Sequence, residues 1–177
     1  MDPSNYSLTS IVCKVMESSV REKILNHLES NKLLSENQHG FMTGRSCTTQ
    51  LLEVLDVWSR IFEDGDNIDV IYLDFAKAFD TVPHRRLLKM LDGYGIQGKI
   101  WIWLHEYLDN RKQCVVVNGQ KSNYEEVASG IPQGSVIGPL LFLIFIIDLP
   151  DNIISLINKN CLQEFGLFMI AIVCKRT

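Results

Sequence analysis

Two carboxylates, Asp74 and Asp80, flank a short segment that follows an apolar run at residues 68–73. The β-rich composition of that run predicts a buried strand with Asp74 at its end. A carboxylate there is costly unless it is paired, hydrogen-bonded or bound to a metal. Because Mg²⁺ takes one or two protein carboxylates together with phosphate oxygens, Asp74 is a candidate metal ligand. The alternative is that Asp74 caps the following turn.

The segment after Asp74 carries an aromatic ring and the second acid. Phe79 lies five residues after Asp74. From there its bulky ring could pack under a nucleotide sugar, or it could simply belong to the core. We expect Asp80 to cap the helix entry at Thr81 and Pro83 rather than to bind a metal.

A glycine-rich loop forms the second candidate element, reading Ser-Gly-Ile-Pro-Gln-Gly-Ser-Val-Ile-Gly-Pro-Leu-Leu-Phe over residues 129–142. Gly130, Gly134 and Gly138 would let backbone amides approach a ligand closely. Gln133 could hydrogen-bond a base edge or a template backbone. The alternative is a loop that only turns the chain.

Seven basic residues could form a track for phosphates, although such residues more often belong to a solvated surface. His105 and Glu106 lack a second histidine four positions on, so they do not form a zinc-protease motif. The basic residues are Arg45, Arg85, Arg86, Lys89, Arg111, Lys112 and Lys121.

Length and composition predict one globular domain. A chain of 177 residues buries roughly 70% of its unfolded surface. The net charge of −4 has the wrong sign for a freestanding nucleic-acid binder, although a local basic track remains compatible with it. Five cysteines without a C-x-x-C pair suggest neither a zinc site nor a disulfide framework. With no signal peptide and no apolar stretch of the ~20 residues that span a bilayer, we expect an intracellular protein, in the nucleus or cytoplasm.

Hydrophobic periodicity predicts an α+β fold. Residues 68–73 are expected to form a central strand buried on both faces. Residues 113–117 and 121–127 are expected to form a hairpin, since Asn118-Gly119 fits a type I′ turn. Helices are predicted at 10–29, 48–63, 83–93, 99–109 and 138–150. The inward faces of the first two are predicted to comprise Val12, Val15, Met16, Val20, Ile24, Leu25 and Leu28, and Leu51, Leu52, Val54, Leu55, Trp58, Ile61 and Phe62.

Taken in order, these motifs closely resemble the reverse transcriptase domain of non-LTR (LINE-type, jockey-like) retrotransposons, from about Ser7 to Asp151. The resemblance rests on Ser-Leu-Thr-Ser-Ile-Val-Cys-Lys-Val-Met-Glu, Leu-Ser-Glu-Asn-Gln-His-Gly-Phe, Tyr-Leu-Asp-Phe-Ala-Lys-Ala-Phe-Asp-Thr-Val-Pro-His, Asn-Arg-Lys-Gln-Cys-Val-Val-Val-Asn-Gly and the glycine-rich loop. It implies part of a right-handed polymerase, with fingers-like helices at 1–67, a palm core at 68–151 and a divergent tail at 152–177. It also implies an RNA template, a DNA primer, dNTPs, and Mg²⁺ or Mn²⁺.

The resemblance assigns roles to individual residues. Asp74 matches the first metal-binding aspartate of the family, and Phe79 matches the aromatic that excludes a 2′-hydroxyl. The other positions that it places at the substrate are Phe75, Gln133, Gly134 and Arg45.

Three departures from the family pattern bear on activity. Met42 replaces an arginine, and Ile147 replaces an asparagine. Relatives follow the stretch around Ile147 with Phe-Ala-Asp-Asp, whereas the tail here reads Gly166-Leu-Phe-Met-Ile-Ala-Ile-Val-Cys-Lys. The sequence therefore predicts that the Ala-Asp-Asp hairpin and the thumb are missing. Because two-metal catalysis needs further carboxylates, it also predicts that this chain is inactive.

Three other hypotheses remain open. The chain could be a non-catalytic remnant that binds nucleic acid. It could be a relic that folds poorly because its palm sheet lacks the central hairpin. Remotely, it could be a phosphohydrolase that uses Asp74 and Asp80.

Overall fold

A computed structural model describes residues 10–34, 38–40, 42, 44–109, 111–148, 162–165 and 169–176, with residues 68–74, 162–165 and 169–176 described as backbone. The chain divides into two compact units. The first combines Met1–Asn31 with Lys77–Phe145, and the second combines Lys32–Ala76 with Ile146–Thr177. The predicted fingers, palm and tail boundaries remain predictions.

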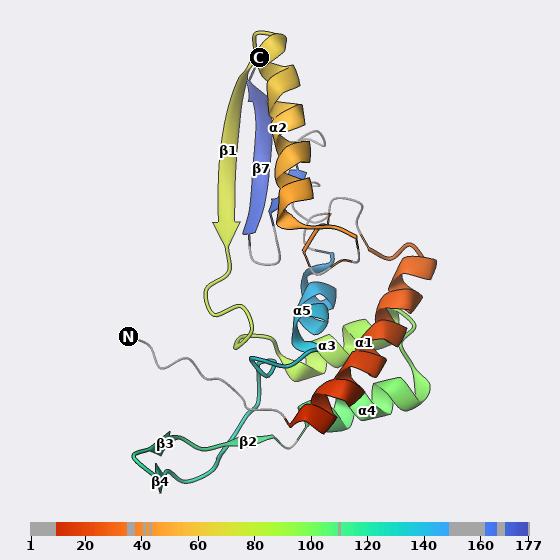
Figure 1. Ribbon diagram of the computed structural model, residues 1–177, viewed down its shortest axis with the longest axis vertical. Coiled ribbons are helices and arrows are strands. Elements are labelled where there is room, and N and C mark those ends of the chain that lie inside the picture. The colour runs from red at the N-terminus through yellow and green to blue at the C-terminus, as the bar shows by residue number, and fades with distance from the viewer. Residues whose placement is uncertain are drawn as a thin grey trace. The chain divides into compact units, whose positions relative to one another are not determined.

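Four helices build the core of the first unit (Figure 1): α1 (Ile11–Ser30), α3 (His84–Gly93), α4 (Gly98–Leu108) and α5 (Gly138–Ile146). Helix α5 is apolar along its whole length, and its residues from Leu140 to Ile144 are all buried. A short helix that is apolar on every side must be enclosed by other elements. Against this core pack the apolar stripes that include Ile24, Leu28, Leu87, Leu91, Leu104 and Leu108, each at most 1% exposed.

The predicted face of α1 is only half right. The helix begins after Ser10, whose hydroxyl accepts a hydrogen bond from the Cys13 amide at 3.3 Å, the bond that an N-cap serine makes. Ile24, Leu25 and Leu28 are buried as predicted. Val12, Val15 and Met16 are exposed, because no described residue covers the first half of that face.

A long hairpin follows α4. Strand β2 (Lys112–Gln113) pairs with β5 (Glu125–Glu126), and β3 (Val116–Val117) pairs with β4 (Gln120–Lys121). Asn118 and Gly119 have φ values of 50° and 79°. Positive φ at both central residues is what a type I′ turn requires, so the predicted hairpin is confirmed.

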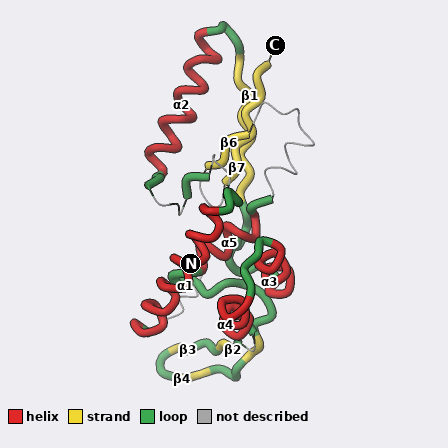
Figure 2. The backbone as a smooth tube through the Cα atoms, turned by 90° about the vertical axis from the view of Figure 1, so that its right-hand side faces the viewer, coloured by secondary structure: helices red, strands yellow, loops and turns green. Residues whose placement is uncertain are grey.

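The second unit contains α2 (Cys47–Glu63) and a three-stranded antiparallel sheet in the order β1-β7-β6. Its strands are β1 (Asn67–Asp74), β6 (Leu162–Phe165) and β7 (Met169–Arg176), and α2 packs along β1 and β6 (Figure 2). A capping box between Ser46 and Thr49 starts α2.

Two predictions about this sheet are wrong. Strand β1 is an edge strand among the described residues, because β7 takes the central position. The tail also does not leave the sheet without a hairpin partner, since β7 pairs with β1 along its whole length and with β6 on its other side. What the tail lacks is the Ala-Asp-Asp sequence, not the strand pair.

The predicted inward face of α2 is right only in part. Leu51, Leu52, Leu55 and Phe62 are 46% to 62% exposed. The stripe that turns inward is narrower, with Gln50 and Val54 buried and Trp58 and Ile61 half-buried. None of the described helices is long and apolar enough to cross a membrane.

Candidate functional site

In the first unit, two segments that are distant in sequence lie side by side. The Gly130 amide donates to the Val82 carbonyl at 2.9 Å, and the Ile131 amide donates to the Phe79 carbonyl at 2.8 Å. An isolated antiparallel bridge between Pro83 and Ser129 extends the pairing. The turn after Asp74 and the glycine-rich loop, which the sequence offered as separate candidates, therefore form one structure.

Gly130 is the tightest point of this junction. Its φ of +92° lies in a region that side chains disfavour, and a Cβ atom would stand 3.0 Å from the Asp80 carbonyl oxygen. The Gly130 carbonyl accepts from His84 Nε2 at 2.8 Å and from Arg111 Nη1 at 3.2 Å. Donors from α3 and from the start of the hairpin thus hold the loop in place.

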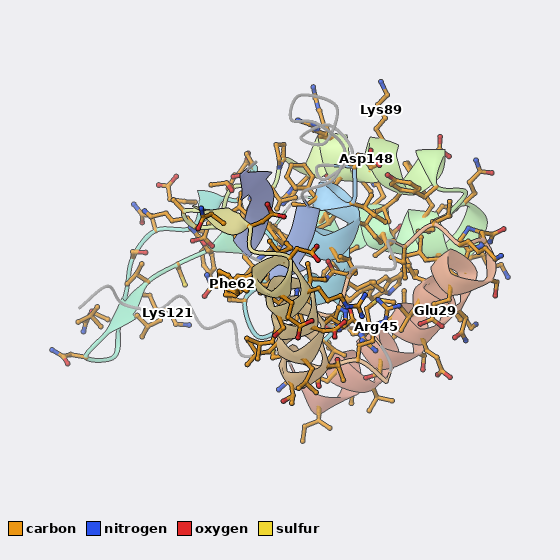
Figure 3. The ribbon with its side chains drawn as sticks, turned by 90° about the horizontal axis from the view of Figure 1, so that it is seen from above. Glu29, Arg45, Phe62, Lys89, Lys121 and Asp148 are labelled. Atoms are coloured by element: carbon orange, nitrogen blue, oxygen red, sulfur yellow. The ribbon has the colours of Figure 1, made fainter. Side chains whose placement is uncertain are left out.

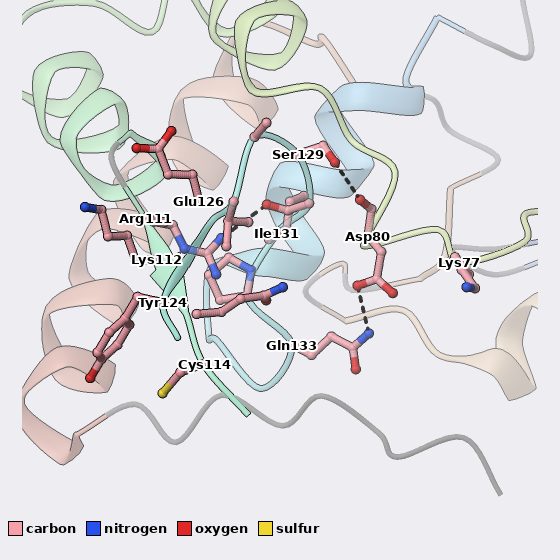
Figure 4. Close-up of a pocket in the computed structure, with 15 residues that line it drawn as sticks. Lys77, Asp80, Arg111, Lys112, Cys114, Tyr124, Glu126, Ser129, Ile131 and Gln133 are labelled. Carbon is pink, nitrogen blue, oxygen red and sulfur yellow. Dashed lines mark hydrogen bonds between the residues drawn. The ribbon is translucent and has the colours of Figure 1, made fainter. Parts of the chain in front are cut away.

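The junction forms one wall of an open cleft of about 610 Å³ (Figure 4). Arg111, Lys112 and Tyr124 line the hairpin side, whereas Asp80 and Gln133 stand on the other side. Three basic side chains outnumber two acidic ones in this cleft. The complete lining is Lys77, Asp80, Arg111, Lys112, Gln113, Cys114, Tyr124, Glu126, Val127, Ala128, Ser129, Gly130, Ile131, Pro132 and Gln133.

Asp80 takes a different role from the predicted one. Helix α3 begins at His84, and its N-cap residue, Pro83, makes no side-chain capping bond. Asp80 is too early in the chain to cap that helix. Its Oδ1 instead accepts from Gln133 Nε2 at 3.2 Å, and its carbonyl accepts from the Ser129 hydroxyl at 3.1 Å. Asp80 therefore orients the glutamine that the sequence singled out.

Phe79 is half-buried and packs against Phe142 of α5, with ring centroids 5.5 Å apart. Phe142 is 2% exposed, so a rigid core residue supports the Phe79 ring. Gly134 has a φ of +85°, which turns the chain directly after Gln133. Phe79, Gln133 and Gly134 are thus brought into the same unit, and Gln133 lines the cleft itself.

Arg111 combines a structural bond with its place in the cleft. Burial lowers the pKa of Arg111, while the nearby Tyr107 raises it. The guanidinium still carries its charge at neutral pH. Arg111 therefore contributes positive charge where the loop and the hairpin meet.

Glu17 of α1 is a functional candidate that sequence reasoning missed. Its side chain is 1% exposed, and its Oε2 accepts from the amides of Val136 at 2.6 Å and Ile137 at 3.3 Å. Tyr107 donates a hydroxyl hydrogen bond to Oε1 at 3.4 Å. A signal was present in the sequence, because Glu17 shares a helical stripe with Ile24 and Leu28.

The Tyr107 hydroxyl is expected to make the free energy of unfolding decrease as the pH becomes alkaline. Burial raises the pKa of Tyr107 from 10.0 to about 12, the Glu17 charge adds to the increase, and a hydrogen bond with Ser135 opposes it. The stabilisation from neutral Tyr107 is fully present below pH 10 and is lost as pH rises toward 12. In urea unfolding at several pH values, we expect Tyr107→Phe to lose less stability than wild type across this window. Equal losses would contradict this account.

The second unit holds the other predicted residues. Phe75 is half-buried. Arg45 Nη1 donates to the Gln38 carbonyl at 2.8 Å and so supports the segment before α2. In that segment His39 is 3% exposed and contacts Glu53 Oε2 at 3.0 Å.

The strand register gives Asp74 no acidic neighbour that could share a pair of divalent ions. Asp74 ends β1 in register with Met169, and Met169 is in register with Phe165. Neither neighbour offers a carboxylate. Glu164 is in register with Ile170, and Ile170 is in register with Leu73. Because successive residues of a strand alternate between the two faces of a sheet, Glu164 and Asp74 belong to opposite faces. In the part of the chain that the structure describes, no cluster of three histidine, cysteine or acidic residues could hold a metal.

Several predicted basic residues lie outside the cleft. Lys89 extends outward from α3, and Lys121 lies on the exposed β4 strand (Figure 3). Arg86 stacks over the Phe145 ring at 5.5 Å. Of the seven predicted basic residues, only Arg111 and Lys112 line the cleft, where Lys77 joins them. A single track through all seven stays a prediction.

Comparison with known proteins is consistent with this geometry. Residues 4–170 match the family model described as "Reverse transcriptase (RNA-dependent DNA polymerase)". The chain is 31% identical to "Probable RNA-directed DNA polymerase from transposon X-element" of Drosophila melanogaster, over 93% of this chain and 18% of that protein. It is 30% identical to "RNA-directed DNA polymerase from mobile element jockey" of the same species, over 85% of this chain and 17% of that protein.

A solved structure shares the fold. Apo telomerase from Candida tropicalis matches with a TM-score of 0.62 at 9% identity, over 90% of this chain and 31% of that chain. At that identity the likeness concerns the fold alone. The chain spans about a fifth of the length of the curated relatives named above.

Proposed function

Because this chain belongs to the reverse transcriptase (RNA-dependent DNA polymerase) family, of the non-LTR retrotransposon type, we propose that it binds an RNA template with its DNA primer at the cleft. The observation that carries the proposal is the junction between residues 79–83 and 129–131, which places Phe79, Asp80 and Gln133 in one unit. The family assignment adds the class of ligand.

The cleft has groups suited to a nucleic acid. Lys77, Arg111 and Lys112 supply positive charge for phosphates. The exposed ring of Tyr124 offers a stacking surface for an unpaired base. Gln133, oriented by Asp80, retains amide groups that can bond a base edge or the template backbone. The Phe79 ring is the proposed support for the nucleotide sugar.

We propose that binding occurs without efficient polymerisation. The family's chemistry uses divalent ions, for which Mg²⁺ or Mn²⁺ are our candidates, and Asp74 is the proposed ligand. In two-metal catalysis, a pair of divalent metal ions would activate the attacking 3′-oxygen of the primer and hold the leaving pyrophosphate. The register of the sheet gives Asp74 no carboxylate neighbour, so the described residues supply an incomplete set of ligands.

A paired assay tests both halves of this proposal. Fluorescence anisotropy with a labelled RNA–DNA hybrid at several salt concentrations measures binding, and primer extension with Mg²⁺ or Mn²⁺ and dNTPs measures catalysis. We expect salt-dependent binding, and extension no greater than that of Asp74→Asn. Absence of binding would overturn the proposed interface. Extension that disappears in Asp74→Asn would show that activity survives, and Glu164→Gln would then test whether that residue contributes despite its register.

A non-catalytic nucleic-acid-binding protein is the second candidate function. It is favoured specifically by Met169 and Phe165, which stand in register with Asp74 where oxygen ligands would be needed. If the chain binds single-stranded RNA and the primed hybrid with equal affinity, the result would favour this second candidate. Tighter binding of the primed hybrid would favour the first candidate, which recognises the primer.

A further inference from the structure

We infer that Glu17 is a positioning residue for the cleft, which acts by fixing the loop that carries Gln133. The inference rests on the proposed function, because it assigns Glu17 a part in binding the hybrid. Glu17 is the last residue of the first motif in the sequence resemblance, which assigns it no role.

The contacts of Glu17 are directed at one place in the loop. Its Oε2 accepts from both Val136 and Ile137, residues 119 and 120 positions away in sequence. Hydrogen bonds to an ionised acceptor are roughly twice as strong as neutral ones. An apolar side chain would fill the same space on α1, but it would leave these two amides without their acceptor. The carboxylate therefore contributes something that packing alone does not.

The loop is held at two points, with Gln133 between them. On one side, the bonds of Gly130 and Ile131 fix it to residues 79–82. On the other side, Glu17 fixes Val136 and Ile137 at the start of α5. Between these points, a turn in which the Ser135 amide donates to Pro132 at 3.2 Å positions Gln133. Loss of the Glu17 bonds would release one of the two anchors.

The second oxygen of Glu17 is also occupied. Tyr107 of α4 donates to Oε1, so the carboxylate joins α1, α4 and the loop. This arrangement restricts the rotation of the carboxylate and keeps Oε2 aimed at the loop. A small displacement of α1 or α4 would therefore reach Gln133 through hydrogen bonds.

Three variants of the whole chain separate positioning from general stability. Glu17→Gln keeps an acceptor oxygen and a donor for Tyr107. Glu17→Met removes the acceptor while keeping the volume. Leu25→Ala is the control, because Leu25 lies on the same helix and is 4% exposed, so its truncation destabilises the unit through a cavity.

The first readout is hydrogen exchange of the Val136 and Ile137 amides by NMR, well below the unfolding transition. We expect exchange about 10-fold faster in Glu17→Met and within about threefold of wild type in Glu17→Gln, because only the former deletes the acceptor. Each rate is compared with those of amides in the middle of α4, which report general destabilisation. Uniform acceleration in Glu17→Met would overturn the inference.

The second readout is a double-mutant cycle on hybrid binding. We expect Glu17→Met to weaken binding about 10-fold and Leu25→Ala to leave it unchanged. If Glu17 acts through Gln133, then Gln133→Ala adds little to Glu17→Met, because coupled residues are not additive. Full additivity would overturn a route through Gln133. If wild type binds no hybrid, the proposed function fails, and the exchange rates alone decide whether Glu17 positions the loop.

Discussion

Reversing two charges in the cleft, with Lys77→Glu and Lys112→Glu together, is expected to weaken binding of the RNA–DNA hybrid about 100-fold near 0.1 M salt. Both side chains are exposed and line the cleft, so the change alters its potential without disturbing the core. Contact charges near 4 Å interact by about 1 kcal/mol each in water, and each reversal replaces an attraction with a repulsion. Two reversals, reduced by screening, correspond to about 100-fold.

The matched control is Lys89→Glu with Lys99→Glu. These residues are also exposed lysines of the first unit, and neither lines the cleft. The net charge changes equally in both double variants. Anisotropy titrations at several salt concentrations should show a large loss, with a shallower salt dependence, for the cleft variant only. Equal losses in the two variants would indicate that net charge, rather than the cleft, governs binding.

Gly130→Ala is expected to lower the free energy of unfolding by about 3 kcal/mol. The methyl group would meet the Asp80 carbonyl oxygen at 3.0 Å and the Phe79 carbonyl oxygen at 3.2 Å. Both are backbone atoms of the paired segment, so neither can move without breaking the junction. Backbone strain at positive φ and overpacking each cost roughly 1 to 3 kcal/mol.

Gly119→Ala isolates the backbone contribution to this loss. Gly119 has a φ of +79°, and nothing lies within 4 Å of its Cβ position. We expect a loss of about 1 kcal/mol there, measured for both variants by urea denaturation. If the two variants lose the same amount, the contact with Asp80 contributes nothing and the junction is softer than the distances indicate.

Local sequence patterns predicted the helices and the hairpin well because their determinants are close in the chain. Ser10 as a cap and Asn118-Gly119 as a turn need only their neighbours. The family resemblance placed both Phe79 and Gln133 at the substrate, and so predicted that they lie near each other. Hydrophobic periodicity cannot predict which distant segments meet. Asp80 shows the limit of local rules, since capping statistics cannot anticipate that Gln133 competes for its carboxylate.

Long-range partners account for the remaining errors. The tail was predicted to leave the sheet incomplete, but strand pairing depends on backbone groups, so β7 pairs with β1 without the family's acidic residues. The inward face of α2 could not be read from periodicity, because exposed apolar residues such as Leu51, Leu52 and Phe62 lie beside the one narrow stripe that packs inward. Glu17 was overlooked because its partners lie 119 and 120 residues away.

That separation has a consequence during synthesis of the chain. Helix α1 leaves the ribosome before the loop, because the amides that Glu17 holds emerge 119 and 120 residues after Glu17. At 5–20 residues per second, this interval lasts roughly 6 to 24 s. Throughout it, Glu17 lacks the two amides from which it accepts hydrogen bonds in the folded unit. The anchor that Glu17 provides at Val136 and Ile137 therefore forms only after the glycine-rich loop has been translated.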